Sequence, residues 1–111
     1  MDCDYKCLTG FVRGYMDALA KRDPSRIAIA SNARFTENNV ELSLGREGLW
    51  ATVTGVAADA LVAADVTTGM GAWIGTVEEN GEPAYYGMRL RVQEEAAIMK
   101  KIIQTRGIKL Q

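Results

Sequence analysis

The stretch MGAWIGTVEENGEPAYYGMRLRVQ, residues 70–93, decides the fold. Two runs rich in β-branched and aromatic residues flank the dipeptide Asn80-Gly81. This dipeptide is the strongest short-range signal for a tight β-hairpin, because both residues tolerate the positive φ angles that the turn requires. We therefore predict two antiparallel strands, over residues 70–78 and 83–93.

Alternation along the second of these strands assigns each side chain to a face. Tyr86, Met88 and Leu90 share one face, which we expect to be the concave side of a sheet. The opposite face carries Tyr85, Arg89 and Arg91. It is expected to be the outer face, either a solvated surface or part of a dimer contact.

A helix is predicted upstream, from Asp4 to about Lys21, because apolar residues recur there at every third or fourth position. These residues are Cys7, Leu8, Phe11, Tyr15, Ala18 and Leu19. Either Asp2 or Asp4, at the start of the stripe, provides an N-cap. Asp23 and Pro24 then provide a cap and a first-turn proline for a short second helix.

The middle of the chain contains a second hairpin signal. Residues 34–37 and 40–44 read as short strands around Asn38-Asn39, because asparagine tolerates positive φ. Residues 49–53 are short enough to be one or two helical turns. Residues 56–64 are compatible with a strand or a helix, and we predict a strand.

Residues 98–105 supply a last strand. Helices first and a long antiparallel meander afterwards predict an α+β fold, in which N-terminal helices cover one face of a curved, mostly antiparallel sheet.

The composition fits one domain over residues 1–111. The formal net charge is −1, which gives no electrostatic footprint for nucleic acid or an anionic membrane, so we expect neither as a partner. The chain contains no histidine, which excludes Ser/His, Cys/His and His-ligated metal chemistry. We expect no metal and no cofactor.

The only two cysteines, Cys3 and Cys7, lie one helical turn apart near the start of the chain. Their spacing fits neither a disulfide framework nor a closed zinc site. We therefore predict reduced thiols on the buried side of the first helix, in a cytoplasmic protein. No apolar run approaches the roughly 18 residues that a membrane-spanning helix needs.

Five short segments together resemble the nuclear transport factor two-like superfamily and, within it, the SnoaL-like proteins. The segments are 14–19 (GYMDAL), 23–25 (DPS), 34–38 (RFTEN), 48–50 (GLW) and 89–92 (RLRV). The resemblance extends over residues 8–105. It implies a conical, strongly bent sheet wrapped by helices around an apolar pocket, often in a homodimer.

The same superfamily contains ketosteroid isomerase, scytalone dehydratase and polyketide cyclases, so the fold alone does not decide the function. The isomerase pattern uses a tyrosine on the first helix, a protonated aspartic acid on a late strand and a carboxylate base at the first hairpin. Tyr15 matches the tyrosine. The base position falls at Asn38 and the aspartic acid position at Met88, and neither side chain can ionise. Scytalone dehydratase depends on histidines, which are absent here.

Glu37 and Tyr15 are the predicted catalytic residues. Strand alternation sends either Glu37 or Asn38 inward, and the sequence leaves open which one. A Glu37 in an apolar cavity is a candidate general acid or base, and the alternative is a solvated carboxylate paired with an arginine. The predicted ligand-binding residues are Phe11, Phe35, Asn38, Trp50, Trp73, Tyr86 and Met88.

Two functional hypotheses follow. The first is a small pocketed protein that binds an apolar or aromatic small molecule. Whether it also acts on that molecule, as a lyase or isomerase through Glu37 and Tyr15, is not decided by the sequence. The alternative is a non-catalytic homodimeric binding or assembly module, in which side chains fill the interior and the sheet face forms the dimer.

Overall fold

The computed structural model describes residues 3–93 and 98–109 of the chain. Helix α1 (Tyr5–Ala20), the short 3-10 helix η1 (Pro24–Arg26) and helix α2 (Leu49–Thr52) accompany a sheet of seven strands. The strands are β1 (Ile29–Glu37), β2 (Val40–Glu41), β3 (Val53–Val56), β4 (Leu61–Asp65), β5 (Met70–Glu79), β6 (Glu82–Gln93) and β7 (Ile98–Lys109). The predicted α+β class is confirmed.

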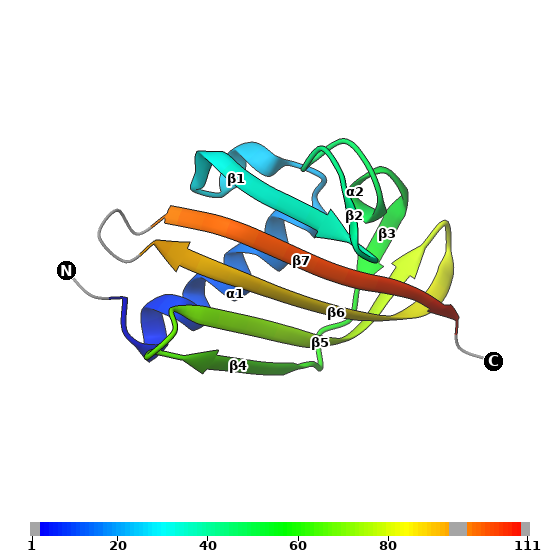
Figure 1. Cartoon of the computed structure of the whole chain (residues 1–111). Coiled ribbons are helices and arrows are strands. Elements are labelled where there is room, and N and C mark those ends of the chain that lie inside the picture. The colour runs from blue at the N-terminus through cyan, green and yellow to red at the C-terminus, as the bar shows by residue number, and fades with distance from the viewer. Residues whose placement is uncertain (1–2, 94–97, 110–111) are drawn as a thin grey trace.

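The strand order is β2-β1-β7-β6-β5-β3, and β4 also pairs with β5. Only β1 and β7 pair in parallel among the described strands, so the sheet is mostly antiparallel, as predicted. Helix α1 lies across one face of the curved sheet, behind it in Figure 1. The opposite face is the outer face.

Both predicted hairpin turns are confirmed. Asn80 and Gly81 have φ angles of 51° and 82°, and Asn38 and Asn39 have φ angles of 50° and 68°. Two consecutive positive φ angles are the signature of the turn type whose twist matches that of paired strands. The strand after the first hairpin is shorter than predicted, because β2 contains only Val40 and Glu41.

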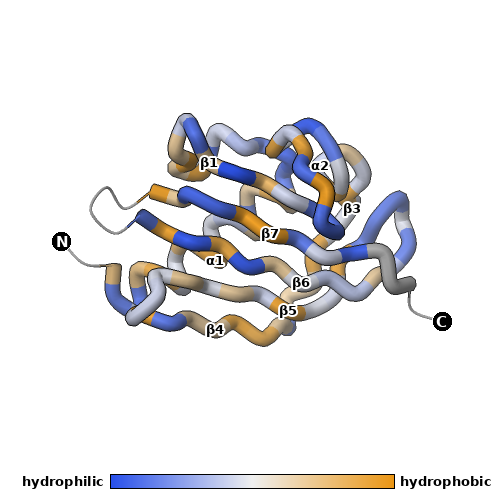
Figure 2. The backbone as a smooth tube through the Cα atoms, in the orientation of Figure 1, coloured by the Kyte–Doolittle hydropathy of each residue, from blue (hydrophilic) through white to orange (hydrophobic). Residues whose placement is uncertain are grey.

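The predicted inner face of β6 is also confirmed. Tyr86, Met88 and Leu90 are buried, whereas Tyr85 and Arg89 are exposed. Hydrophilic and hydrophobic positions alternate along β6 and β7 in Figure 2.

Helix α1 begins after Asp4, one of the two candidate caps. The Asp4 carboxylate accepts a hydrogen bond from the Cys7 backbone N–H at 2.9 Å, which satisfies one of the free donors of the first turn. The buried face of the helix includes Val12 and Met16, which the predicted stripe omitted. Phe11 is only half-buried and lies at the edge of this face.

The predicted strand over residues 56–64 is two strands. β3 pairs with residues 77–79 of β5, and β4 pairs with residues 70–74. Both therefore use the same edge of β5, at different ends. The intervening segment, 57–60, follows that edge, where the Ala57 N–H donates to the Thr76 carbonyl at 3.1 Å.

The prediction of free thiols is wrong, because Cys3 and Cys7 form a disulfide. Cys3 precedes the Asp4 cap and is not held at helical spacing, so its Cα lies 5.1 Å from that of Cys7, within the range that a disulfide spans. The expected cytoplasmic location rested on free thiols and loses that support. Among the described helices, none is long and apolar enough to cross a membrane.

Helix α1 approaches the sheet closely at Gly71. A Cβ atom at Gly71 would lie only 2.5 Å from Cγ2 of Val12. By contrast, a Cβ at Gly87 would meet nothing within 4 Å.

We predict that Gly71→Ala lowers the free energy of unfolding by about 1–3 kcal/mol, because the new methyl group forces α1 away from the sheet. The matched control Gly87→Ala does not lower it, because glycine in a strand interior costs about 0.5–1 kcal/mol relative to alanine. Urea denaturation of the two variants measures both values. Equal effects would contradict the close approach of α1.

Candidate functional site

The side chain of Gln104, on β7, connects the two predicted catalytic residues. The Tyr15 hydroxyl donates to Gln104 Oε1 at 2.5 Å, and Gln104 Nε2 donates to Glu37 Oε2 at 3.1 Å. The Tyr86 hydroxyl donates to the same Oε1, also at 2.5 Å. Gln104 is fully buried. One amide therefore links α1, β1, β6 and β7.

Trp50 extends this cluster on the side of α2. Its indole N–H donates to the Tyr15 hydroxyl at 3.0 Å, and the two rings meet edge to face with centroids 5.5 Å apart. Every fully buried polar side-chain atom of the described residues has a hydrogen-bond partner. The cluster is thus satisfied from within the chain.

The two phenols of the cluster are hydrogen-bond donors and not bases. Burial raises the pKa of Tyr15 far above its usual range, and the nearby Glu37 carboxylate raises it further, although the Trp50 hydrogen bond opposes the rise. Burial also raises the pKa of Tyr86, with smaller contributions from Tyr15 and Glu37. Both hydroxyls therefore stay protonated near neutral pH.

Glu37 faces inward, which answers the question that strand alternation left open. The residue is 5% exposed. Its Oε2 accepts the Leu49 backbone N–H at 2.9 Å, and its Oε1 accepts Nε of Arg106 at 2.7 Å. A Cβ at Gly48 would lie 2.6 Å from Oε1, so only glycine fits beside this carboxylate.

Asn38 lies outside the cluster, in the exposed turn. Its side-chain amide donates to the Arg106 carbonyl at 3.0 Å and accepts the Arg106 N–H at 3.1 Å. These two bonds anchor the turn to β7. The structure does not bring Asn38 to Tyr15.

Arg106 completes the electrostatics of the cluster. Its guanidinium binds the carboxylates of Glu37 and Glu79. Partial burial lowers the pKa of Arg106, but the bonds to the two carboxylates outweigh this effect, so its pKa lies above the usual value. The buried charge of Glu37 is therefore compensated by a permanent cation.

Sequence reasoning missed Gln104 and Arg106. The available signal was alternation on β7, which places both on the same inward face as Ile102. Polar residues at such positions need partners, and Glu37 and Tyr15 are those partners.

The other predicted ligand-binding residues are divided between the core and two clefts. Phe35, Trp50, Tyr86 and Met88 are buried in the core. Phe11 and Trp73 line separate clefts on the two flanks of α1.

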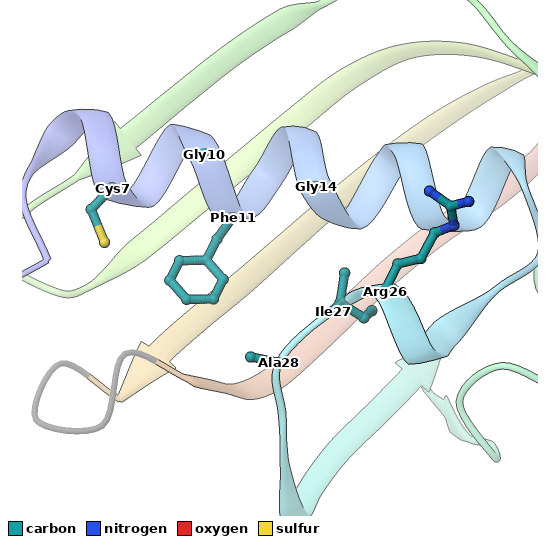
Figure 3. Close-up of a pocket in the computed structure, with 7 residues that line it drawn as sticks. All are labelled: Cys7, Gly10, Phe11, Gly14, Arg26, Ile27 and Ala28. Carbon is teal, nitrogen blue, oxygen red and sulfur yellow. The ribbon is translucent and has the colours of Figure 1, made fainter.

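The first cleft, here called the Phe11 cleft, has a volume of about 280 Å³ and lies between α1 and the segment that follows η1. Its lining residues are Cys7, Gly10, Phe11, Gly14, Arg26, Ile27 and Ala28. Figure 3 shows the Phe11 ring projecting from α1 toward Ile27 and Ala28. The helix residues have the spacing i, i+3, i+4, i+7 and so share one face.

The second cleft, here called the Trp73 cleft, has a volume of about 390 Å³. It is lined by Arg13, Met16, Asp17, Ala20, Val56, Ala57, Ala58, Ala60, Val62 and Trp73. Neither cleft offers a metal site, because no three Cys, Asp or Glu side chains gather anywhere in residues 3–93 and 98–109.

Comparisons with known proteins support the fold and do not identify a function. No family model matches the chain, and no curated protein matches its sequence. Among solved structures, the chain is similar to the crystal structure of BvnE pinacolase from Penicillium brevicompactum, with a TM-score of 0.67, 11% identity, and coverage of 91% of this chain and 83% of that one. This likeness supports a nuclear transport factor two-like fold for the chain.

Proposed function

We propose that this protein binds a small apolar or aromatic molecule in the Phe11 cleft. The observation that carries the proposal is a pair of glycines, Gly10 and Gly14, in the middle of α1. Both are exposed, and a Cβ at either would meet nothing within 4 Å. Packing within the described chain therefore does not require glycine at these positions.

Glycine in a helix interior costs about 1 kcal/mol relative to alanine. The two glycines of α1 lower its stability without allowing any close contact between elements. They do keep the helix surface beside Phe11 open. A ligand that lies against this surface gives the two residues a function.

The cleft has the walls that an aromatic ligand needs. Phe11 and Ile27 are half-buried and apolar, and a ring between them gains contact on both faces. Arg26 is the charged residue at the cleft, and it pairs with Asp23 at 3.3 Å and Asp17 at 3.9 Å. We infer an aromatic ligand with a polar end.

Glu37 and Tyr15 have a positioning role in this proposal. Both side chains are buried, and both form a hydrogen bond with the side chain of Gln104. They fix α1 against β1 and β7, and thereby set the position of Phe11. Binding without catalysis is thus the proposed activity.

We predict that Gly14→Leu weakens binding of 2-naphthol at least tenfold and raises the free energy of unfolding by about 0.5–1 kcal/mol. The leucine side chain occupies the cleft, and leucine is a far better helix former than glycine. Titrations followed by the backbone amide signals of Gly10, Ile27 and Ala28 give the affinity, and urea denaturation gives the stability.

Ala20→Phe, which changes the other flank of α1, is the matched control and leaves the 2-naphthol affinity unchanged. Undiminished binding in Gly14→Leu would remove the Phe11 cleft as the site. A loss of stability in that variant would show that the cleft is not open.

A second candidate function, homodimerisation through the outer face, is favoured by exposed apolar side chains there. Leu61, Ile74 and Tyr85 are 64%, 57% and 53% exposed. Leu61 and Ile74 are directly paired across β4 and β5, and β4 is largely hydrophobic in Figure 2. A groove of about 240 Å³ lies beside Ile74 and Gly87.

Charges flank this apolar surface in a self-complementary way. Ile74 pairs with Gly87. Glu78 lies four residues beyond Ile74 toward one end of the sheet, and Arg91 lies four residues beyond Gly87 toward the other end. A two-fold axis that lies in the contact plane over the Ile74–Gly87 pair, perpendicular to the strands, would place Arg91 of one copy near Glu78 of the other. The occupant that fits this face is a second copy.

We predict a dimer at micromolar concentration that Ile74→Asp converts to a monomer, because the new carboxylate would be buried at the centre of the contact. Val40→Asp, which changes an apolar residue of similar exposure on β2, leaves the dimer intact. Sedimentation equilibrium measures both masses. A wild-type chain of 12.1 kDa in solution would exclude the dimer.

A further inference from the structure

We propose that the Trp73 cleft is a second ligand site, for a small uncharged molecule that carries a hydrogen-bond acceptor on an apolar body, such as a ketone or a lactone. This site lies on the opposite flank of α1 from the Phe11 cleft. None of its lining residues is shared with that cleft.

The indole of Trp73 provides an unused hydrogen-bond donor. Trp73 is 5% exposed, and within residues 3–93 and 98–109 its N–H has no hydrogen-bond partner. The other tryptophan differs, because the Trp50 N–H donates to Tyr15. A buried indole N–H normally finds a partner, so the N–H of Trp73 is unusual for its degree of burial.

This donor is accessible to a ligand. Each fully buried polar side-chain atom of the described residues is bonded, and the unbonded Trp73 N–H therefore belongs to the small accessible part of the ring. Trp73 lines the cleft between α1 and residues 56–62. A molecule in this cleft can accept the hydrogen bond of the Trp73 indole N–H, for which the described residues provide no acceptor.

Packing holds the indole in position without any hydrogen bond. A Cβ at Gly75 would lie 3.0 Å from Cη2 of Trp73 and 3.2 Å from Cζ3, so glycine gives the ring its space. The Tyr86 ring packs on Trp73 at a centroid distance of 5.7 Å and an angle of 58°. The donor is thus preorganised, which reduces the ordering cost of binding.

The rest of the cleft selects an uncharged, apolar ligand. Met16, Val56 and Val62 provide aliphatic walls, and residues 57, 58 and 60 are alanines that leave room between them. The volume of about 390 Å³ is within the range of small-molecule sites, roughly 300–1,000 Å³.

Among the described residues that line the cleft, charged side chains lie only on α1. The residues are Arg13 and Asp17, both exposed. Asp17 is already paired with Lys21 at 3.0 Å. The neutral side-chain donor available to a ligand in this cleft is therefore the indole N–H of Trp73, which pairs best with a carbonyl oxygen.

The test compares 1-tetralone with tetralin, which has the same ring system without the carbonyl. Each is titrated into ¹⁵N-labelled protein, and the amide signals of Ala57, Ala60 and Val62 give the two dissociation constants. The variant Trp73→Phe keeps an aromatic ring and removes the donor. Ala20→Phe narrows the cleft from an exposed position, and Phe11→Ala controls for the opposite flank.

We expect 1-tetralone to shift the indole proton signal of Trp73 and to leave that of Trp50 in place. In Trp73→Phe the dissociation constant of 1-tetralone, divided by that of tetralin, rises about fivefold. This increase corresponds to the loss of one neutral hydrogen bond. Ala20→Phe weakens the binding of both molecules, and Phe11→Ala weakens the binding of neither.

An unchanged ratio in Trp73→Phe would overturn the proposal, as would tighter binding of the matched carboxylic acid, which would assign the polar contact to Arg13. If Phe11→Ala abolishes the binding of both molecules and Ala20→Phe has no effect, both molecules bind in the Phe11 cleft. That result would overturn the proposed site at Trp73 and support the one at Phe11.

Discussion

The buried amide of Gln104 constrains the rest of the structure, because its two ends are bonded to different elements. Its oxygen accepts the hydroxyls of Tyr15 and Tyr86, and its nitrogen donates to Glu37. A buried polar group left without a partner costs about 1–3 kcal/mol. Helix α1 and strands β1, β6 and β7 must therefore meet at this point, and Arg106 neutralises the carboxylate that the meeting buries.

This constraint also determines where ligands can bind. The two predicted catalytic residues, Tyr15 and Glu37, are both bonded to Gln104 in the core, while helix α1 has a cleft on each flank. On one flank Gly10 and Gly14 leave the helix surface open, and on the other Trp73 offers an indole N–H that is bonded to none of the described residues. The same helix that Tyr15 fixes to the core thus forms a wall of both clefts.

Local features of the fold were predictable from the sequence, and long-range ones were not. The Asn80-Gly81 turn and the acidic cap of α1 depend on neighbouring residues. The turn was predicted, and the cap was narrowed to Asp2 or Asp4. The bond between Tyr15 and Gln104 joins residues 89 positions apart, and no periodicity reports such a pair. The disulfide was missed because Cys3 lies outside the helix, where helical spacing does not apply. Tyr15 and Glu37 were selected for their chemistry, but Gln104, which connects them, was not.

The most direct test of this constraint is the free energy of unfolding of Gln104→Met, measured by urea denaturation in two backgrounds. The substitution keeps the length of the side chain and removes its hydrogen bonds. In the wild-type chain we expect a loss of about 2–4 kcal/mol, because two phenols and one carboxylate lose a partner. In a chain that also carries Tyr15→Phe and Tyr86→Phe, we expect a clearly smaller loss, since those donors are absent. Equal losses in the two backgrounds would contradict the central role of Gln104.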